Sequence, residues 1–199
     1  MFVGLTGGTG CGKSTALECF SSLGWKTLDA DGICYELYGD RNSGVAEAIR
    51  RRWGDRVFSG NGDVDRKKVA DIVFRSRKER LWLNSLLHPM VLERAVKEAR
   101  KSKNRNVIFA VPLLFEAKWE KEFDCTVSIW TDRKTQYQRL AKRGWSLEEI
   151  ERRCKCQITP DEKMELADFA IINNGGIDLL YQQCKILNKD IRKNYGKKQ

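Results

Sequence analysis

Histidine is almost absent from this sequence, and long apolar runs are missing altogether. The only histidine among the 199 residues is His88, and Cys154 and Cys156 have the wrong spacing for a zinc knuckle, so we expect no structural metal site. No apolar segment approaches the ~20 residues of a membrane span. Lys13 and three glycines interrupt the first apolar stretch, which argues against a signal peptide. Because the seven cysteines are odd in number and scattered, we expect free thiols and a cytoplasmic protein with no membrane association.

The charge is strongly one-sided. With 37 basic and 27 acidic residues, the chain carries a formal net charge of +10. Such an excess suits either nucleic acid or small polyanionic substrates. The basic clusters at residues 50–52 and 66–68 are more typical of exposed helix surfaces, and aromatic stacking segments of the RNA-binding kind are missing. We expect no nucleic-acid partner, and nothing in the sequence indicates an oligomeric state.

The most informative segment is residues 7–14, which match the phosphate-loop (P-loop) pattern G-x-x-x-x-G-K-[S/T] at every fixed position. A short apolar strand at residues 2–6 precedes it, and an amphipathic helix at residues 14–23 follows. The glycines let backbone N–H groups surround an anion, and the helix dipole favours the same phosphate. Lys13 is expected to reach the β- and γ-phosphates, and the Ser14 hydroxyl to ligate Mg²⁺. The segment predicts a nucleoside triphosphate site.

Short apolar segments alternate with helical ones along the rest of the chain. Strands are expected at residues 2–6, 24–29, 106–111, 125–130 and 169–172. Asp65 is a plausible helix N-cap, and His88-Pro89 either begins a helix or kinks one. The alternation predicts an α/β protein whose parallel sheet is covered by helices on both faces.

Two carboxylates follow the second expected strand. Asp29 and Asp31 would face the phosphate loop together if the chain there is extended, because alternate residues of a strand point the same way. Their possible roles are general base and water-mediated Mg²⁺ binding. No acidic residue ends the strand at 106–111, which argues against a switch GTPase or motor ATPase and makes this pair more necessary.

Residues 133–157 are rich in arginine and lysine. A mobile basic flap over the triphosphate would stabilise the transferring phosphoryl group and exclude water. An exposed amphipathic helix pair that meets only solvent explains the pattern equally well.

Several separated motifs together resemble the dephospho-CoA kinase family, over nearly the whole chain. Residues 4–15 are similar to its GLTGGIGSGKS segment, with Thr9 and Cys11 as departures. The remaining matches are Asp29-Ala30-Asp31, Asp65-Arg66, Leu86-Leu87-His88-Pro89, Pro112-Leu113-Leu114-Phe115-Glu116, Gln138-Arg139-Leu140, Arg143, Gln157, and Ala167-Asp168 with Asn173. The DAD, HP and PLLFE segments separate this family from other small-molecule kinases better than the P-loop can.

The resemblance implies a three-layer P-loop NTPase fold of nucleotide-monophosphate-kinase type with a five-stranded parallel sheet. It places the whole chain, residues 1–199, in one kinase domain, with a helical substrate subdomain at about 33–105 and a lid at about 133–157. The implied reaction transfers the γ-phosphoryl group of Mg-ATP to the ribose 3′-hydroxyl of dephospho-CoA. ATP and Mg²⁺ are therefore the expected cofactors, and dephospho-CoA the expected small-molecule partner.

The resemblance also assigns roles to individual residues. Asp31 is the implied general base and a water-mediated Mg²⁺ ligand, supported by Asp29, while Lys13 and Arg143 stabilise the transferring group. The implied nucleotide-binding residues are Gly8, Gly10, Cys11, Gly12, Lys13, Ser14, Thr15 at the α-phosphate, Arg153 or its neighbour Arg152, and Asn173 near the adenine. On the substrate side the resemblance implies Asp29, Asp31, His88 and Leu113.

Cys11 raises a separate expectation. A thiol beside phosphate-binding N–H groups would have a lowered pKa and be open to oxidation, although a neutral small residue explains the position as well. The alternatives for the whole chain are another nucleoside or nucleotide kinase and, more remotely, an RNA-binding or regulatory P-loop protein.

Overall fold

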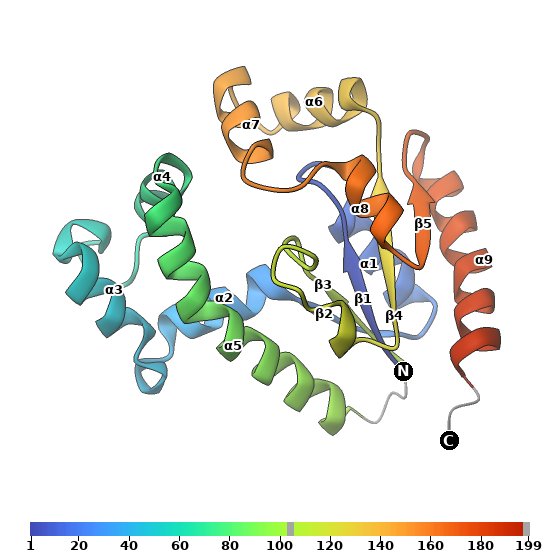
Figure 1. Cartoon of the computed structure of the whole chain (residues 1–199), viewed down its shortest axis with the longest axis horizontal. Helices are drawn as coiled ribbons and strands as arrows, with labels where there is room; N and C mark the ends of the chain where they lie inside the picture. Colours follow the sequence, from blue (N-terminus) through green and yellow to red (C-terminus); the bar gives the residue numbers. More distant parts are fainter. Residues whose placement is uncertain (103–105, 197–199) are drawn as a thin grey trace. The chain divides into compact units, whose positions relative to one another are not determined.

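The computed structural model describes residues 1–102 and 106–196, and at its centre is a five-stranded sheet whose strands all run parallel. The strand order is β2-β3-β1-β4-β5. The strands are β1 (Phe2–Thr6), β2 (Lys26–Asp29), β3 (Val107–Ala110), β4 (Cys125–Trp130) and β5 (Phe169–Ile172). All five predicted strands are present, and the second begins two residues later than expected. In Figure 1 the carboxyl ends of these strands lie on the side of helices α6 and α7.

One face of the sheet packs against the helices α1 (Lys13–Ser22) and α9 (Ile177–Tyr195). Alternate strand residues supply this core, since side chains alternate between faces along a strand. The sheet residues are Val3, Leu5, Ile108, Ala110, Cys125, Val127, Ile129 and Ile171, and the helices add Ala16, Phe20, Leu180 and Ile191. This burial fixes α1, and with it the loop that precedes α1, at the carboxyl edge of β1.

The other face of β1 is covered by the segment that follows β3. A Cβ atom on Gly4 would lie 2.6 Å from Leu114 and 2.9 Å from Phe123, so only glycine lets this segment approach the strand. The Phe123 ring also packs against that of Phe2 in a tilted arrangement, with 4.8 Å between ring centroids. The single-turn helix η3 (Glu120–Glu122) lies in this segment, and helix α8 (Pro160–Leu166) packs beside β4.

Helices α6 (Arg133–Lys142) and α7 (Leu147–Cys154) follow β4, and α8 leads into β5. Each of the three has a side-chain N-cap, from Asp132, Ser146 and Thr159 respectively. Thr159 and Glu162 form a complete capping box, which fixes where α8 begins. Residues 133–166 thus form three short helices joined by turns.

The chain divides into two compact units, residues 30–97 and residues 1–29 with 98–199. The first contains α2 (Ala30–Gly39), η1 (Arg41–Ser43), α3 (Val45–Trp53), η2 (Asp55–Val57), α4 (Arg66–Arg75) and most of α5 (Arg77–Lys101). Asp65 caps α4 through Lys67 N and Lys68 N, as predicted. The expected end of the helical subdomain, residue 105, lies outside the described residues. None of the described helices is long and apolar enough to cross a membrane.

The pair His88-Pro89 does not begin a helix. Helix α5 runs continuously from Arg77 to Lys101 with Pro89 inside it. Leu83 and Leu87 before the proline and Val91 after it are buried. Packing of these side chains therefore maintains the helix through Pro89.

Candidate active site

The P-loop joins β1 to α1, as the sequence predicts. Gly12 is the N-cap residue of α1, with φ of 103°, and a side chain there would collide with the Asn173 amide. No side chain caps α1, in contrast to α6, α7 and α8, and no acidic residue lies in its first turn. The N–H groups of this turn are therefore available to a bound anion, which the helix dipole also favours.

Lys13 lies across the loop. Its Nζ donates to the carbonyl oxygens of Gly7 at 2.7 Å and Gly8 at 3.2 Å. The ammonium group is thus held at the mouth of the loop, within reach of an oxyanion that the loop binds. Ser14 and Thr15 follow in the first turn of α1, and the Ser14 side chain is exposed.

Cys11 departs from the sequence-based expectation. Its side chain is fully buried and belongs to the core beneath the loop, not to the phosphate-facing surface. Burial raises the pKa of the thiol, although Lys13 and nearby backbone groups oppose the shift. The prediction of a lowered pKa is therefore wrong, and the alternative of a neutral small residue holds, because the Cys11 side chain is enclosed in the core. All seven cysteines have free thiols.

Helix α6 is attached directly to the P-loop. Gln136 Nε2 donates to the Thr9 carbonyl oxygen at 2.7 Å, and Leu140 packs so closely that a Cβ on Gly10 would lie 2.9 Å from its Cγ. Gln136 is 5% exposed and Leu140 is fully buried. Sequence reasoning missed both contacts, because a polar helix full of charge gives no sign of which two side chains face a partner.

The segment after β5 supports the loop from a third direction. Asn173 Nδ2 donates to the Cys11 carbonyl oxygen at 2.8 Å, and Asn173 is 6% exposed. Asn174 Oδ1 accepts from Thr131 Oγ1 at 2.7 Å and from Asp132 N at 3.0 Å, which ties this segment to the start of α6. Asn173 therefore lies against the P-loop, with its side-chain amide engaged in holding the loop.

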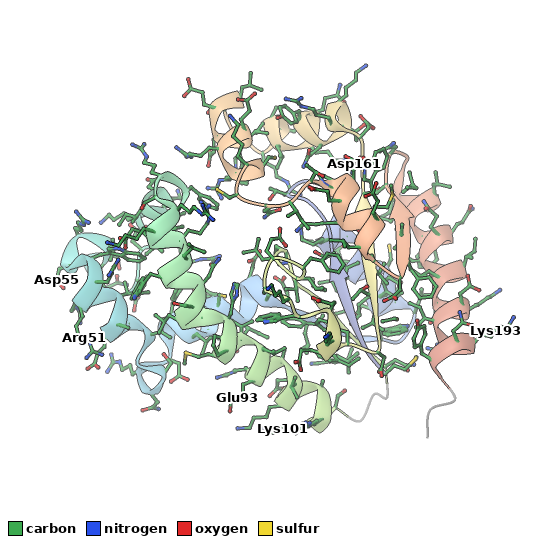
Figure 2. All side chains as sticks on the ribbon, viewed as in Figure 1. Arg51, Asp55, Glu93, Lys101, Asp161 and Lys193 are labelled. Atoms are coloured by element: carbon green, nitrogen blue, oxygen red, sulfur yellow. The ribbon has the colours of Figure 1, made fainter. Side chains whose placement is uncertain are left out.

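A cavity of about 400 Å³ opens beside the loop, between the end of β4, helices α6 and α7, and the start of α8. Gln136, which binds Thr9, also lines it. Its lining includes two aromatic side chains, Trp130 and Tyr137, and two basic ones, Arg133 and Lys155. The Arg133 guanidinium lies 5.0 Å from the centre of the Tyr137 ring. Trp130 Nε1 donates to Asp161, labelled in Figure 2, at 3.0 Å.

The lid arginines differ in their surroundings. Arg143 is exposed at the end of α6. Arg153 binds Glu149 Oε1 through Nη2 at 2.8 Å, and its guanidinium lies 4.2 Å from the Trp145 ring centre. Arg152 Nε and Arg139 Nη1 are buried with no hydrogen-bond partner among the described residues. A buried donor without a partner is costly, so these two arginines suit a ligand better than Arg153 does.

The two predicted carboxylates lie on different elements. Asp29 is the last residue of β2, opposite Ala110 of β3, and is exposed. Helix α2 begins at Ala30, so Asp31 lies in the first turn of a helix. The argument from an extended chain is therefore wrong, because the strand ends between the two residues. Strand β3 ends in apolar residues, as expected. It therefore lacks the acidic residue that binds the metal ion in switch GTPases.

The remaining predicted residues fall on both units. Leu113 is half-buried in the segment after β3. His88 is half-buried on α5 of the unit formed by residues 30–97. In that unit the hydroxyl pKa of Tyr38 is raised, chiefly by burial and also by Cys34 and Asp31.

Comparisons with known proteins agree with one another. The family model described as dephospho-CoA kinase matches residues 1–178. A dephospho-CoA kinase of Staphylococcus aureus is 37% identical over 201 aligned positions, covering 98% of this chain and 97% of that protein. One from Aquifex aeolicus is 32% identical, covering 96% and 98% respectively.

Solved structures extend the likeness to the fold. The TT1252 protein of Thermus thermophilus superposes with a TM-score of 0.79 at 28% identity, covering 96% of this chain and 97% of that one. A dephospho-CoA kinase from Campylobacter jejuni gives 0.68 at 28% identity over the same shares. A shikimate kinase from Acinetobacter baumannii gives 0.56 at 18% identity, covering 98% and 94%, and shares the fold.

Proposed function

This chain belongs to the dephospho-CoA kinase family, and on that premise we propose which of its residues carry the family's reaction. The protein is a P-loop kinase that transfers the γ-phosphoryl group of ATP to the ribose 3′-hydroxyl of dephospho-CoA, giving CoA and ADP. The observation that carries the assignment of the site is the uncapped first turn of α1 behind a complete P-loop.

The loop and the first turn of α1 bind the triphosphate in this proposal. Backbone N–H groups from Gly8 to Gly12 surround the β-phosphate, and Thr15 contacts the α-phosphate. Lys13 exchanges its bonds to the carbonyl oxygens of Gly7 and Gly8 for the β- and γ-phosphate oxygens. This exchange costs little, because one set of charge-assisted hydrogen bonds replaces another.

The residues around Ser14 fit Mg²⁺. Magnesium prefers oxygen ligands, keeps several waters, and takes most remaining ligands from the substrate phosphates. The exposed Ser14 hydroxyl supplies one protein oxygen, and Asp31 acts through water. When bound, the ion would neutralise charge on the β- and γ-phosphate oxygens.

Asp31 is the proposed general base. Its carboxylate takes the proton of the 3′-hydroxyl as that oxygen attacks the γ-phosphorus, and ADP leaves with the electrons of the broken P–O bond. Asp31 has the exposure that contact with a substrate needs. Asp29, two residues earlier and also exposed, supports it.

Arginines of the lid stabilise charge on the transferring group. Arg143 is exposed, as contact with a bound phosphate requires. For the second position we favour Arg152 over Arg153, because Arg152 Nε is buried without a partner while Arg153 is engaged by Glu149 and Trp145. His88 and Leu113 on the substrate side, and Asn173 near the adenine, remain proposals from the resemblance. Free thiols throughout suit the reducing cytoplasm.

The decisive experiment measures ADP release from Mg-ATP with and without dephospho-CoA and identifies the product by mass. We expect dephospho-CoA to stimulate ADP release and to gain one phosphate on its 3′-hydroxyl. Adenosine and AMP serve as control acceptors. ATP binding without stimulation by dephospho-CoA would contradict the acceptor while leaving the phosphate site in place.

A further inference from the structure

Lys163 of α8 is a lysine with no exposed surface. Its Nζ lies 3.0 Å from Glu116 Oε1, and it also donates to the Pro112 carbonyl oxygen. Burial lowers the pKa of this ammonium group, and the neighbouring Glu116 carboxylate opposes the shift. Because the group is enclosed and its donors are used within the protein, it is not placed to contact a substrate.

Glu116 extends the pair to the chain that leaves the lid. Its Oε1 accepts from the backbone N–H of Ile158 at 3.0 Å, and its side chain is 18% exposed. Ile158 lies between α7 and α8, whereas Pro112 and Glu116 lie after β3. One ion pair therefore joins the segment after β3 to the connection between the lid helix α7 and α8.

This junction is in direct contact with the P-loop. Two residues beyond Ile158, the Pro160 ring lies so close to Gly8 that a Cβ there would be 2.9 Å from Pro160 Cγ. Thr6, the last residue of β1, also donates to the Pro112 carbonyl oxygen, at 3.5 Å. The pair is thus connected to the loop through Pro160 on one side and through β1 on the other.

A buried ion pair contributes little net stability, because desolvating two charges offsets most of their attraction, and apolar replacements are often as stable. What it supplies here is a set of directed bonds to three separate segments. We propose that Lys163 and Glu116 are positioning residues that hold the α7–α8 connection against the P-loop and so set the phosphate-binding geometry of Gly8. This inference rests on the proposed function. It adds two residues that contact neither ATP nor dephospho-CoA.

The test compares Glu116→Gln, Lys163→Met and the double variant with the unchanged protein. ADP affinity is measured by titration calorimetry, and the ATP KM by turnover, at a temperature where circular dichroism shows each variant folded. We expect all three to weaken ADP binding and to raise the ATP KM by about tenfold or more, since an ångström of misplacement at such a site is costly. The double variant should be no worse than either single one, because each single change already breaks the Lys163–Glu116 ion pair.

A structural control separates positioning from loss of folded protein. Thr126 is 3% exposed, and its Oγ1 donates to Asp168 at 2.8 Å near the amino end of β4, away from the loop. Thr126→Val should lower the melting temperature and leave ADP affinity and the ATP KM within about twofold, since partial unfolding reduces the active fraction and not the affinity of what remains.

The inference is overturned if any folded variant of the pair keeps the ADP affinity of the unchanged protein, or if the double variant regains both stability and affinity. Glu116→Gln is nearly isosteric and keeps an acceptor for Ile158 N, so it serves if Lys163→Met alone does not fold. ADP affinity does not depend on the acceptor. Failure of dephospho-CoA to react with the unchanged protein would therefore contradict the proposed function and not this inference.

Discussion

Asp31 is the proposed general base, so its substitution tests the chemical step apart from nucleotide binding. Asp31→Asn keeps the size of the side chain and removes its ability to take a proton. We expect turnover to fall by about 10²–10⁴-fold, as for other general bases, with ADP affinity within about twofold. The measurement is steady-state turnover beside calorimetric ADP binding.

A matched control for this variant is Asp178→Asn. Asp178 is another exposed carboxylate in the first turn of a helix, α9, and its substitution should leave turnover unchanged. Near-normal turnover of Asp31→Asn would move the role of base to Asp29 or to solvent.

The adjacent lid arginines give a second prediction at this scale. Arg152→Gln should lower kcat by about tenfold or more, because it removes a buried donor that the described part of the protein leaves to a ligand. Arg153→Gln should chiefly destabilise α7, because it loses the Glu149 bond and the Trp145 contact. Turnover and thermal melting of both variants distinguish these effects. The opposite ranking in kcat would return the role to Arg153.

Motif residues were predictable one by one, and the direction of their side chains was not. Lys13 and Ser14 follow from spacing alone, since the P-loop pattern encodes a backbone shape. The inward turn of Cys11, the Gln136 contact with Thr9 and the buried Lys163 each depend on a tertiary partner far along the chain. A polar residue on a charged helix does not reveal such a partner in the sequence.

At the scale of elements, helix α6 packs directly against the P-loop at Gly10. Gly10→Ala places a Cβ at φ of 83° and against Leu140, so both the backbone and the contact with α6 are strained. We expect kcat/KM for ATP to fall by about tenfold or more, measured by ADP release.

Gly24→Ala is the comparison for this prediction. Gly24 has nearly the same φ, 84°, but open space around its Cβ. The Gly24→Ala variant should lose about 1–2 kcal/mol of stability from backbone strain alone and keep the kcat/KM of the unchanged protein. Equal kcat/KM in the two variants would show that the contact with α6 does not matter to catalysis.

Helices α3 and α5 are linked by Glu79, which binds Arg52 at 2.9 Å and accepts from Trp53 Nε1 at 2.8 Å. Its bonds to Arg52 and Trp53 lower the pKa of its carboxyl group from 4.5 to about 2. Because the pKa is lower in the folded state, Glu79 stabilises the fold above its unfolded pKa. That contribution is lost as the pH falls from about 4.5 towards 2.

The predicted result is that the difference in urea midpoint between the unchanged protein and Glu79→Gln is largest at neutral pH and shrinks on acidification. Glu47→Gln is the control, since Glu47 meets Arg51 only at 3.9 Å with both side chains about 80% exposed. A difference that is independent of pH would contradict the assigned pKa.

The strands were predictable because buried parallel strands are short, continuous apolar runs between polar turns. β1, β4 and β5 match the expected bounds to the residue. Helix α5 was not predictable as one element, since its Pro89 is a local signal for a boundary and only tertiary packing overrides it.

At the scale of the whole molecule, the net charge of +10 suits substrates that carry several negative charges. We expect the ATP KM to rise several-fold when salt is raised from about 50 mM to about 500 mM, because screening shortens the reach of this field. Sodium chloride titration with kcat monitored in parallel checks this. An ATP KM independent of salt would show that only short-range contacts bind the triphosphate.

The division of the chain into one continuous and one discontinuous unit has a consequence for how the protein is made. On the ribosome, β1 and β2 emerge first, but the strand that lies between them in the sheet, β3, is translated only after the whole of residues 30–97. By then the whole unit of residues 30–97 has been translated and its internal contacts can form. Strand β1, in contrast, cannot pair until β3 and β4 have been made. Nascent chains that end before β3 therefore hold two unpaired strands, of which β1 is apolar, and this is the interval of synthesis in which the protein most needs a chaperone.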